Sequence, residues 1–168
     1  MYSGKTRPRI RIRPQPVDRL IETAGLAALL LIIILTFVYY RDMPSQIPVH
    51  FSFSGEPDQM GGKPTIWRIP VISLILYVAL TLINRFPHIF NYPVRITEEN
   101  TFRLYRLATR TLRILKTMLM CLFLYITISV IWIGLGKSEK FNAPGILGFI
   151  ILTILLFGIM ISKMVRNK

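Results

Sequence analysis

The sequence predicts an all-α integral membrane protein, with four transmembrane helices and a small extracytoplasmic strand-turn element between the first two. Of its 168 residues, 52% are hydrophobic and only 17% are charged, whereas roughly a quarter are charged in soluble domains. The mean hydropathy is +0.50. The apolar residues gather in four runs, 20–40, 69–86, 114–133 and 144–162, and about 20 apolar residues suffice to cross a bilayer. Residues 20–168 are therefore expected to form a single membrane domain.

A basic arm, residues 1–19, precedes the first run. It carries six lysine or arginine residues and one acid, Asp18. We expect a flexible cytoplasmic arm that lies on anionic lipid headgroups, and the alternative is that it pairs with another part of the protein or with a partner. The run 20–40 has Glu22 as its single charged residue, one turn in, where the helix dipole tolerates a carboxylate. It is too long for a signal-peptide core, so we expect an uncleaved anchor.

The loop 41–68 contains a segment that is neither an apolar membrane span nor a basic tail. Ile47, Val49, Phe51 and Phe53 alternate with proline, histidine and serine, which is the period of a half-buried strand. The stretches 55–58 and 61–62 then supply residues typical of turns. The sequence therefore predicts a strand followed by turns.

Residues 97–113 are expected to form a basic amphipathic helix at the cytoplasmic surface. Arg103, Arg106, Arg110 and Arg113 are spaced by 3, 4 and 3 residues, so they share one helical face. We expect this face to contact lipid headgroups, and an anionic-ligand site is the alternative. No helix breaker separates the segment from the third run, which predicts one long helix.

The distribution of charge predicts the orientation. The arm, the 85–116 region and the C-terminal tail together carry 16 of the 21 basic residues. The positive-inside rule therefore predicts a plasma-membrane protein whose two termini both lie in the cytoplasm. Trp67 and Trp132 fall at the opposite ends of their spans, as an aromatic belt requires. The loop 41–68 is thus expected to face outward.

Several function classes are disfavoured by the sequence. The centres of the four spans lack acids, histidines and basic residues, which argues against a proton-coupled pump, an ion pathway or an intramembrane metalloprotease. The basic residues flank apolar runs, so we expect no nucleic-acid partner. Cys121 is the one cysteine, so no disulfide forms within the chain. No phosphate-binding, zinc-protease or serine-hydrolase motif occurs, and no cofactor is expected.

Three residues of the outward loop carry groups that bind metals: His50, Glu56 and Asp58. An imidazole and two carboxylates can ligate zinc if the turn brings them together. The alternative is a strand histidine that donates a hydrogen bond and an aspartate that caps its own turn. A third interpretation is a recognition surface that presents Phe51, Phe53 and His50, because binding residues favour loops held by a rigid scaffold.

The same loop carries a resemblance. The pattern Pro44-x-x-Ile47-Pro48-x-His50-Phe51, then Gly55-x-Pro57-Asp58 and Gly61-x-Lys63, resembles a bacterial membrane domain of unknown function. That domain also forms the N-terminal part of sporulation-delaying toxin immunity proteins. The resemblance covers roughly residues 15–90 and implies no enzymatic activity. Its motif gives the candidate binding residues Ile47, Pro48, His50, Phe51, Gly55, Pro57, Asp58 and Lys63. The further membrane module of the immunity proteins is not found in this sequence.

We therefore expect a non-enzymatic, multi-pass plasma-membrane protein whose outward loop recognises a partner or envelope component. Immunity to a peptide toxin is one form of this function. The expected partners are anionic lipid, a protein or peptide on the outer face, and a second copy of the chain. The alternatives are a metal-binding or metal-assisted site in the loop, and a small transporter.

Overall fold

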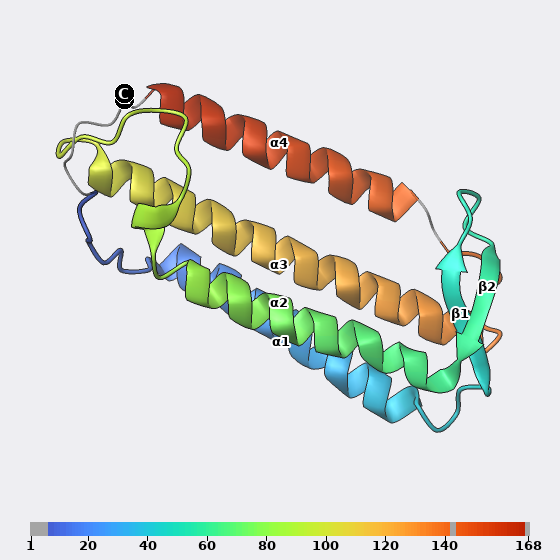
Figure 1. The fold of residues 1–168 in the computed structure, drawn as a ribbon. Coiled ribbons are helices and arrows are strands. Elements are labelled where there is room, and N and C mark those ends of the chain that lie inside the picture. The colour runs from blue at the N-terminus through green and yellow to red at the C-terminus, as the bar shows by residue number, and fades with distance from the viewer. Residues whose placement is uncertain (1–6, 142–143, 167–168) are drawn as a thin grey trace.

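The computed structural model describes residues 7–141 and 144–166 of the chain (Figure 1). Within these residues, four helices are long and apolar enough to cross a membrane, which confirms the predicted fold class. They are α1 (Pro16–Tyr39), α2 (Arg68–Ile83) with the 3-10 helix Lys63–Trp67 before it, α3 (Thr101–Gly134) and α4 (Pro144–Arg166). The strands β1 (Gln46–Phe51) and β2 (Pro57–Gly62) form a hairpin between α1 and α2. This hairpin lies at one end of the helices, which we call the hairpin end; the α2–α3 connector and both ends of the described chain lie at the other, the basic end.

Local signals shift the helix boundaries from the predicted runs. α1 begins at Pro16, inside the predicted arm, because proline suits the first turn and the Asp18 carboxylate accepts a 2.8 Å hydrogen bond from the Gln15 amide. The predicted amphipathic segment and third span form the single 34-residue helix α3, as expected, but the helix begins at Thr101 and not at the predicted residue 97. Residues 1–6 of the predicted arm lie outside the described residues.

Helices α1 and α3 pack closely along one another, and small residues permit the approach. A Cβ atom at Gly25 would lie 2.8 Å from Thr117 Oγ1, and this hydroxyl donates a 2.9 Å hydrogen bond to the Ile21 carbonyl. Ala28, Leu29 and Met120 bury their side chains further along the contact. By contrast, none of the most apolar window of α4 is buried inside the protein, so this helix presents most of its surface to lipid.

The hairpin departs from the predicted alternation because it contains a bulge. The strands are antiparallel, and their register shifts between Pro48 and His50. Ile47 and Pro48 are therefore both buried, whereas Val49 is exposed. The prediction of a turn at 61–62 is wrong, since both glycines belong to β2. Gly61 instead permits close pairing: a Cβ atom there would lie 2.6 Å from Val49 Cγ1.

The hairpin is anchored to the helices through its first strand. Ile47 is 1% exposed and belongs to a cluster with Met43, Ile66 and two residues near the end of α3, Val130 and Ile131. The cluster joins the loop after α1, the 3-10 helix and α3. Burial of this apolar surface holds the hairpin in a fixed position over the helix ends.

The basic arm also contacts the protein rather than lying apart. Arg7 donates hydrogen bonds to the carbonyl oxygens of His88 and Phe90, and its guanidinium lies 5.7 Å from the centre of the Tyr92 ring. For Arg7, the structure therefore favours the alternative in which the arm pairs with another part of the chain.

Candidate binding site at the hairpin end

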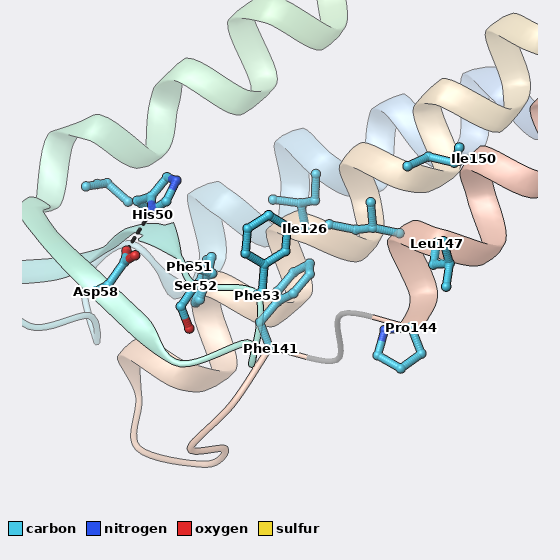
Figure 2. A pocket seen from close by; sticks show the side chains of 12 residues that line it. His50, Phe51, Ser52, Phe53, Asp58, Ile126, Phe141, Pro144, Leu147 and Ile150 are labelled. Atoms are coloured by element: carbon cyan, nitrogen blue, oxygen red, sulfur yellow. Dashed lines mark hydrogen bonds and ion pairs between the residues drawn. The ribbon is translucent and has the colours of Figure 1, made fainter.

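Two polar residues meet across the hairpin. His50 of β1 and Asp58 of β2 lie on opposite strands, and His50 Nδ1 is 2.6 Å from Asp58 Oδ1 (Figure 2). Both side chains are largely exposed. The carboxylate fixes the imidazole orientation through Nδ1, which leaves Nε2 to face other groups. Sequence reasoning proposed this pair as potential metal ligands, and the structure does bring the two residues together.

The third proposed metal ligand points elsewhere. Glu56 Oε1 forms an ion pair with Lys140 Nζ at 2.8 Å, and Lys140 lies in the loop between α3 and α4. The hydrogen bond from Lys140 and its positive charge lower the pKa of the Glu56 carboxyl, and the carboxylate in turn raises the pKa of Lys140. The three candidate ligands are therefore not assembled into one site. Among the described residues, no group of three or more histidine, cysteine, aspartate or glutamate side chains could hold a metal ion.

Two further contacts join the hairpin to Phe141 of the α3–α4 loop, and a third joins Phe141 to α3. The Phe141 amide donates a 2.7 Å hydrogen bond to the Gly55 carbonyl. The Phe51 and Phe141 rings stack with their centres 4.9 Å apart, and Tyr125 of α3 meets Phe141 edge-on at 5.3 Å. Gly55 has φ +84°, and a Cβ atom there would lie 2.0 Å from the Phe141 oxygen. Glycine is therefore required at this position by both backbone conformation and space.

These contacts frame a cavity of about 900 Å³ between the hairpin, α3 and the first two turns of α4. We call it the hairpin groove. Figure 2 shows Phe53 and Phe141 in its middle, Leu147 and Ile150 on the α4 side, and His50 and Asp58 at the opposite edge. Its lining is predominantly apolar and includes a few polar groups, which is the usual composition of a ligand pocket.

The eight motif residues divide into two groups in the structure. His50, Phe51 and Asp58 line the hairpin groove. The other five stabilise the hairpin: Ile47 and Pro48 are buried, Gly55 meets Phe141, Pro57 begins β2, and Lys63 donates a 3.0 Å hydrogen bond to the Arg41 carbonyl. The motif is thus mostly a structural frame for three residues that reach the groove.

Sequence reasoning did not identify the α3 and α4 side of the groove. Ile126, Phe141, Leu147 and Ile150 lie far from the motif along the chain. Ile126, Leu147 and Ile150 carry the apolar signal of any membrane span, and Phe141 lies between the third and fourth apolar runs, so no local pattern distinguishes them. On the hairpin side, the recognition-surface interpretation named Phe51, Phe53 and His50, and all three line the groove.

A second arrangement, at the basic end, was also missed. Asp18 and Glu22 of α1 meet Arg110, Arg113 and Lys116 of α3, and we call these five residues the ionic cluster. Arg110 Nε lies 2.7 Å from Asp18 Oδ1, and Arg113 Nε lies 3.3 Å from Glu22 Oε1. The exposed fractions of Asp18 and Arg113 are only 2% and 8%.

Lys116 connects three helices at this cluster. Its Nζ lies 2.5 Å from Glu22 Oε2 and donates a 2.8 Å hydrogen bond to Thr81 Oγ1 of α2. The ammonium also lies 4.3 Å from the centre of the Tyr77 ring. Lys116 is 16 residues from Trp132 along α3, which is about 24 Å at 1.5 Å per residue. This places it within a hydrocarbon core of about 30 Å, where an ionised group requires such partners.

The ionic cluster corrects the prediction of one uniform arginine face on α3. Arg103 is exposed, as a headgroup contact requires, and Arg106 is half-buried. Arg113 is buried against α1, and Arg110 is bound to Asp18 and Gln15. The difference arises because the two acids of α1 approach the same helical face, which the spacing within α3 does not reveal.

The match to a family of known sequences covers the hairpin region. Residues 27–74 match the family described as Domain of unknown function (DUF1648), which confirms the predicted resemblance for the second half of α1, the hairpin and the start of α2, within the predicted extent of roughly 15–90. A 95-residue stretch is 28% identical to an uncharacterized protein of the archaeon Archaeoglobus fulgidus, over 50% of this chain and 52% of that protein. The chain thus spans about half the length of this curated relative. No solved structure matches. Bacterial origin and a link to immunity proteins stay predictions.

Proposed function

We propose that this multi-pass membrane protein is a non-enzymatic recognition protein, whose hairpin faces the outside of the cell and binds an amphipathic envelope component. The observation that carries the proposal is the hairpin groove. It combines a cavity of about 900 Å³ with an apolar lining and one hydrogen-bonded polar pair. Such a composition suits a ligand with an apolar part and a polar end.

The charge asymmetry supports the outward orientation of the hairpin. Arg110, Arg113 and Lys116 pair with acids inside the protein, so they contribute little to topology. Without them, 13 basic residues are left at the basic end and 5 at the hairpin end. The positive-inside rule therefore still favours a cytoplasmic basic end.

The rigidity of the frame supports a role in recognition. The groove is held by the Ile47 cluster on one side and by the Phe141 contacts on the other. Side chains on a preformed frame lose little conformational entropy when they bind a ligand. Phe53 is exposed inside this frame, and burial of its ring would contribute to the affinity for an apolar group.

Site-specific photo-crosslinking tests the proposal. A photoreactive benzoylphenylalanine replaces Phe53 in the groove, and in a matched control it replaces Met60, which is exposed on β2 outside the groove. Intact cells are irradiated, and adducts on the purified chain are identified by mass spectrometry. We expect a discrete adduct from position 53 and none from position 60.

A second pair of variants ties the adduct to the groove. Leu147→Trp fills the α4 wall of the groove, whereas Ile154→Trp adds the same ring to an equally exposed position outside the lining. The adduct should disappear with Leu147→Trp and persist with Ile154→Trp. A secreted peptide as the adduct would support toxin immunity. Equal adduct formation from positions 53 and 60 would refute the recognition function.

A further inference from the structure

We infer that the hairpin groove holds a phospholipid of the adjacent leaflet, with an acyl chain between α3 and α4 and an ammonium headgroup beside Asp58. The inference rests on the proposed recognition function and names the class of its ligand. Three observations carry it: the division of the lining with depth, the exposure of the α4 wall, and the charge of the polar edge.

The lining is divided into polar and apolar parts along the helix direction. Ile126 lies eight residues before the end of α3, and Ile150 lies six residues after the start of α4. At 1.5 Å per residue these positions are about 12 Å and 9 Å from the helix ends, within the hydrocarbon layer. His50 and Asp58 are on the hairpin, beyond the helix ends. A phospholipid has the same division, with the chain inside and the headgroup outside.

The α4 wall of the groove is open to lipid. Leu147 and Ile150 line the groove and yet are 59% and 47% exposed. No part of the most apolar window of α4 is buried inside the protein. An acyl chain can therefore move from the bilayer into the groove without crossing a polar surface. A water-soluble peptide would instead have to displace lipid from this wall, so continuity with the bilayer favours a lipid.

The polar edge favours an ammonium headgroup over an anionic one. The groove lining includes the Asp58 carboxylate and the His50 imidazole, and none of its residues is lysine or arginine. The rings of Phe53 and Phe141 lie in the middle of the groove, between this edge and α4, and aromatic faces attract ammonium groups. A headgroup with net negative charge would find no lysine or arginine in this lining.

Photoactivatable lipids test the inference. The full chain is reconstituted in phosphatidylglycerol vesicles, whose headgroup has no ammonium group, with a trace of phosphatidylethanolamine or of phosphatidylglycerol that carries a diazirine in the middle of one acyl chain. Labelled positions are mapped by peptide mass spectrometry. We expect labelling at Ile126 and Ile150 to exceed labelling at Ile75, an exposed residue of α2 at a similar depth. One exposed carboxylate contact is worth roughly 0.2–1 kcal/mol, so groove labelling should favour phosphatidylethanolamine by about 1.4- to fivefold.

Two substitutions separate the chain contact from the headgroup contact. Leu147→Trp should reduce groove labelling to the Ile75 level, and Ile154→Trp should leave it unchanged. Asp58→Asn should abolish the preference for phosphatidylethanolamine while the acyl-chain labelling persists. Groove labelling no higher than at Ile75, or equal labelling by the two lipids in the unsubstituted chain, would overturn the inference. In that case a protein or peptide adduct in the cell crosslinking experiment would still support the recognition function.

Discussion

Replacement of Glu22 by leucine should destabilise the helix bundle strongly, because it leaves a buried ammonium without its carboxylate. Lys116 is 1% exposed, and its Nζ would keep only the Thr81 hydroxyl and the Tyr77 ring as partners. Removal of one member of a buried ion pair costs about 3–5 kcal/mol. We expect the free energy of unfolding to fall by about 3 kcal/mol, near the lower end of this range. The cation–π contact of Lys116 with Tyr77 remains and still stabilises the ammonium by about 1 kcal/mol.

Removal of the other partner, Lys116, should lower the free energy of unfolding by a smaller amount. In Lys116→Met, Glu22 keeps Arg113 at 3.3 Å and is itself 28% exposed, so we expect a loss of about 1–2 kcal/mol. The double variant carries both Glu22→Leu and Lys116→Met. If the two groups interact directly, its loss of free energy of unfolding should be about 1–3 kcal/mol smaller than the sum of the losses in the two single variants.

Equilibrium unfolding in mixed detergent micelles, followed by circular dichroism, measures these differences. Thr23→Leu is the matched control, because Thr23 is exposed beside Glu22 and bonds only within its own helix. The control should stay within about 0.5 kcal/mol of the unsubstituted chain. Strict additivity of the Glu22 and Lys116 variants would refute the proposed role of their contact.

Three further predictions concern the hairpin end. Gly55→Ala should lower the melting temperature more than Gly136→Ala, because both glycines have positive φ but only Gly55 faces a backbone oxygen; equal effects would contradict the close contact with Phe141. Glu56→Gln should lower the melting temperature above pH 4.5, the ordinary pKa of this carboxyl, and have no effect in acid. The folded-state pKa is depressed, so the ion pair stabilises above the unfolded pKa and is lost as pH falls through the folded value; a difference unchanged in acid would contradict this. Phe53→Cys in a Cys121→Ser background should react with a membrane-impermeant maleimide in intact cells, and labelling only after permeabilisation would reverse the proposed orientation.

The helical part of the fold could be predicted because apolar runs of sufficient length have few alternatives in a bilayer. The continuity of α3 followed from the absence of a breaker between Thr101 and Gly134. The helix starts were less accurate, since α1 gains a turn through Asp18. The strand alternation failed at Val49 because a bulge inserts an extra residue, and only pairing with β2 reveals a bulge.

The candidate site could be predicted only on the hairpin side. His50 and Asp58 were within eight residues of one another, so their meeting across a turn was a local inference. Glu56 looked equally suitable as a ligand, but its partner Lys140 belongs to a distant loop. The α3–α4 wall of the groove and the ionic cluster depend on how helices pack, and the apolar pattern of each helix does not specify its neighbours.

The ionic cluster also has a consequence for the order of biosynthesis. Asp18 is separated from Arg110 by 92 residues, and Glu22 from Lys116 by 94. At roughly 5–20 residues per second, the ribosome therefore needs about 5–20 s to deliver the cations after the carboxylates. During this interval α1 is a nascent helix with two acids and no counter-charge from α3. The contacts between these acids and α3 can therefore form only after α3 has been synthesised.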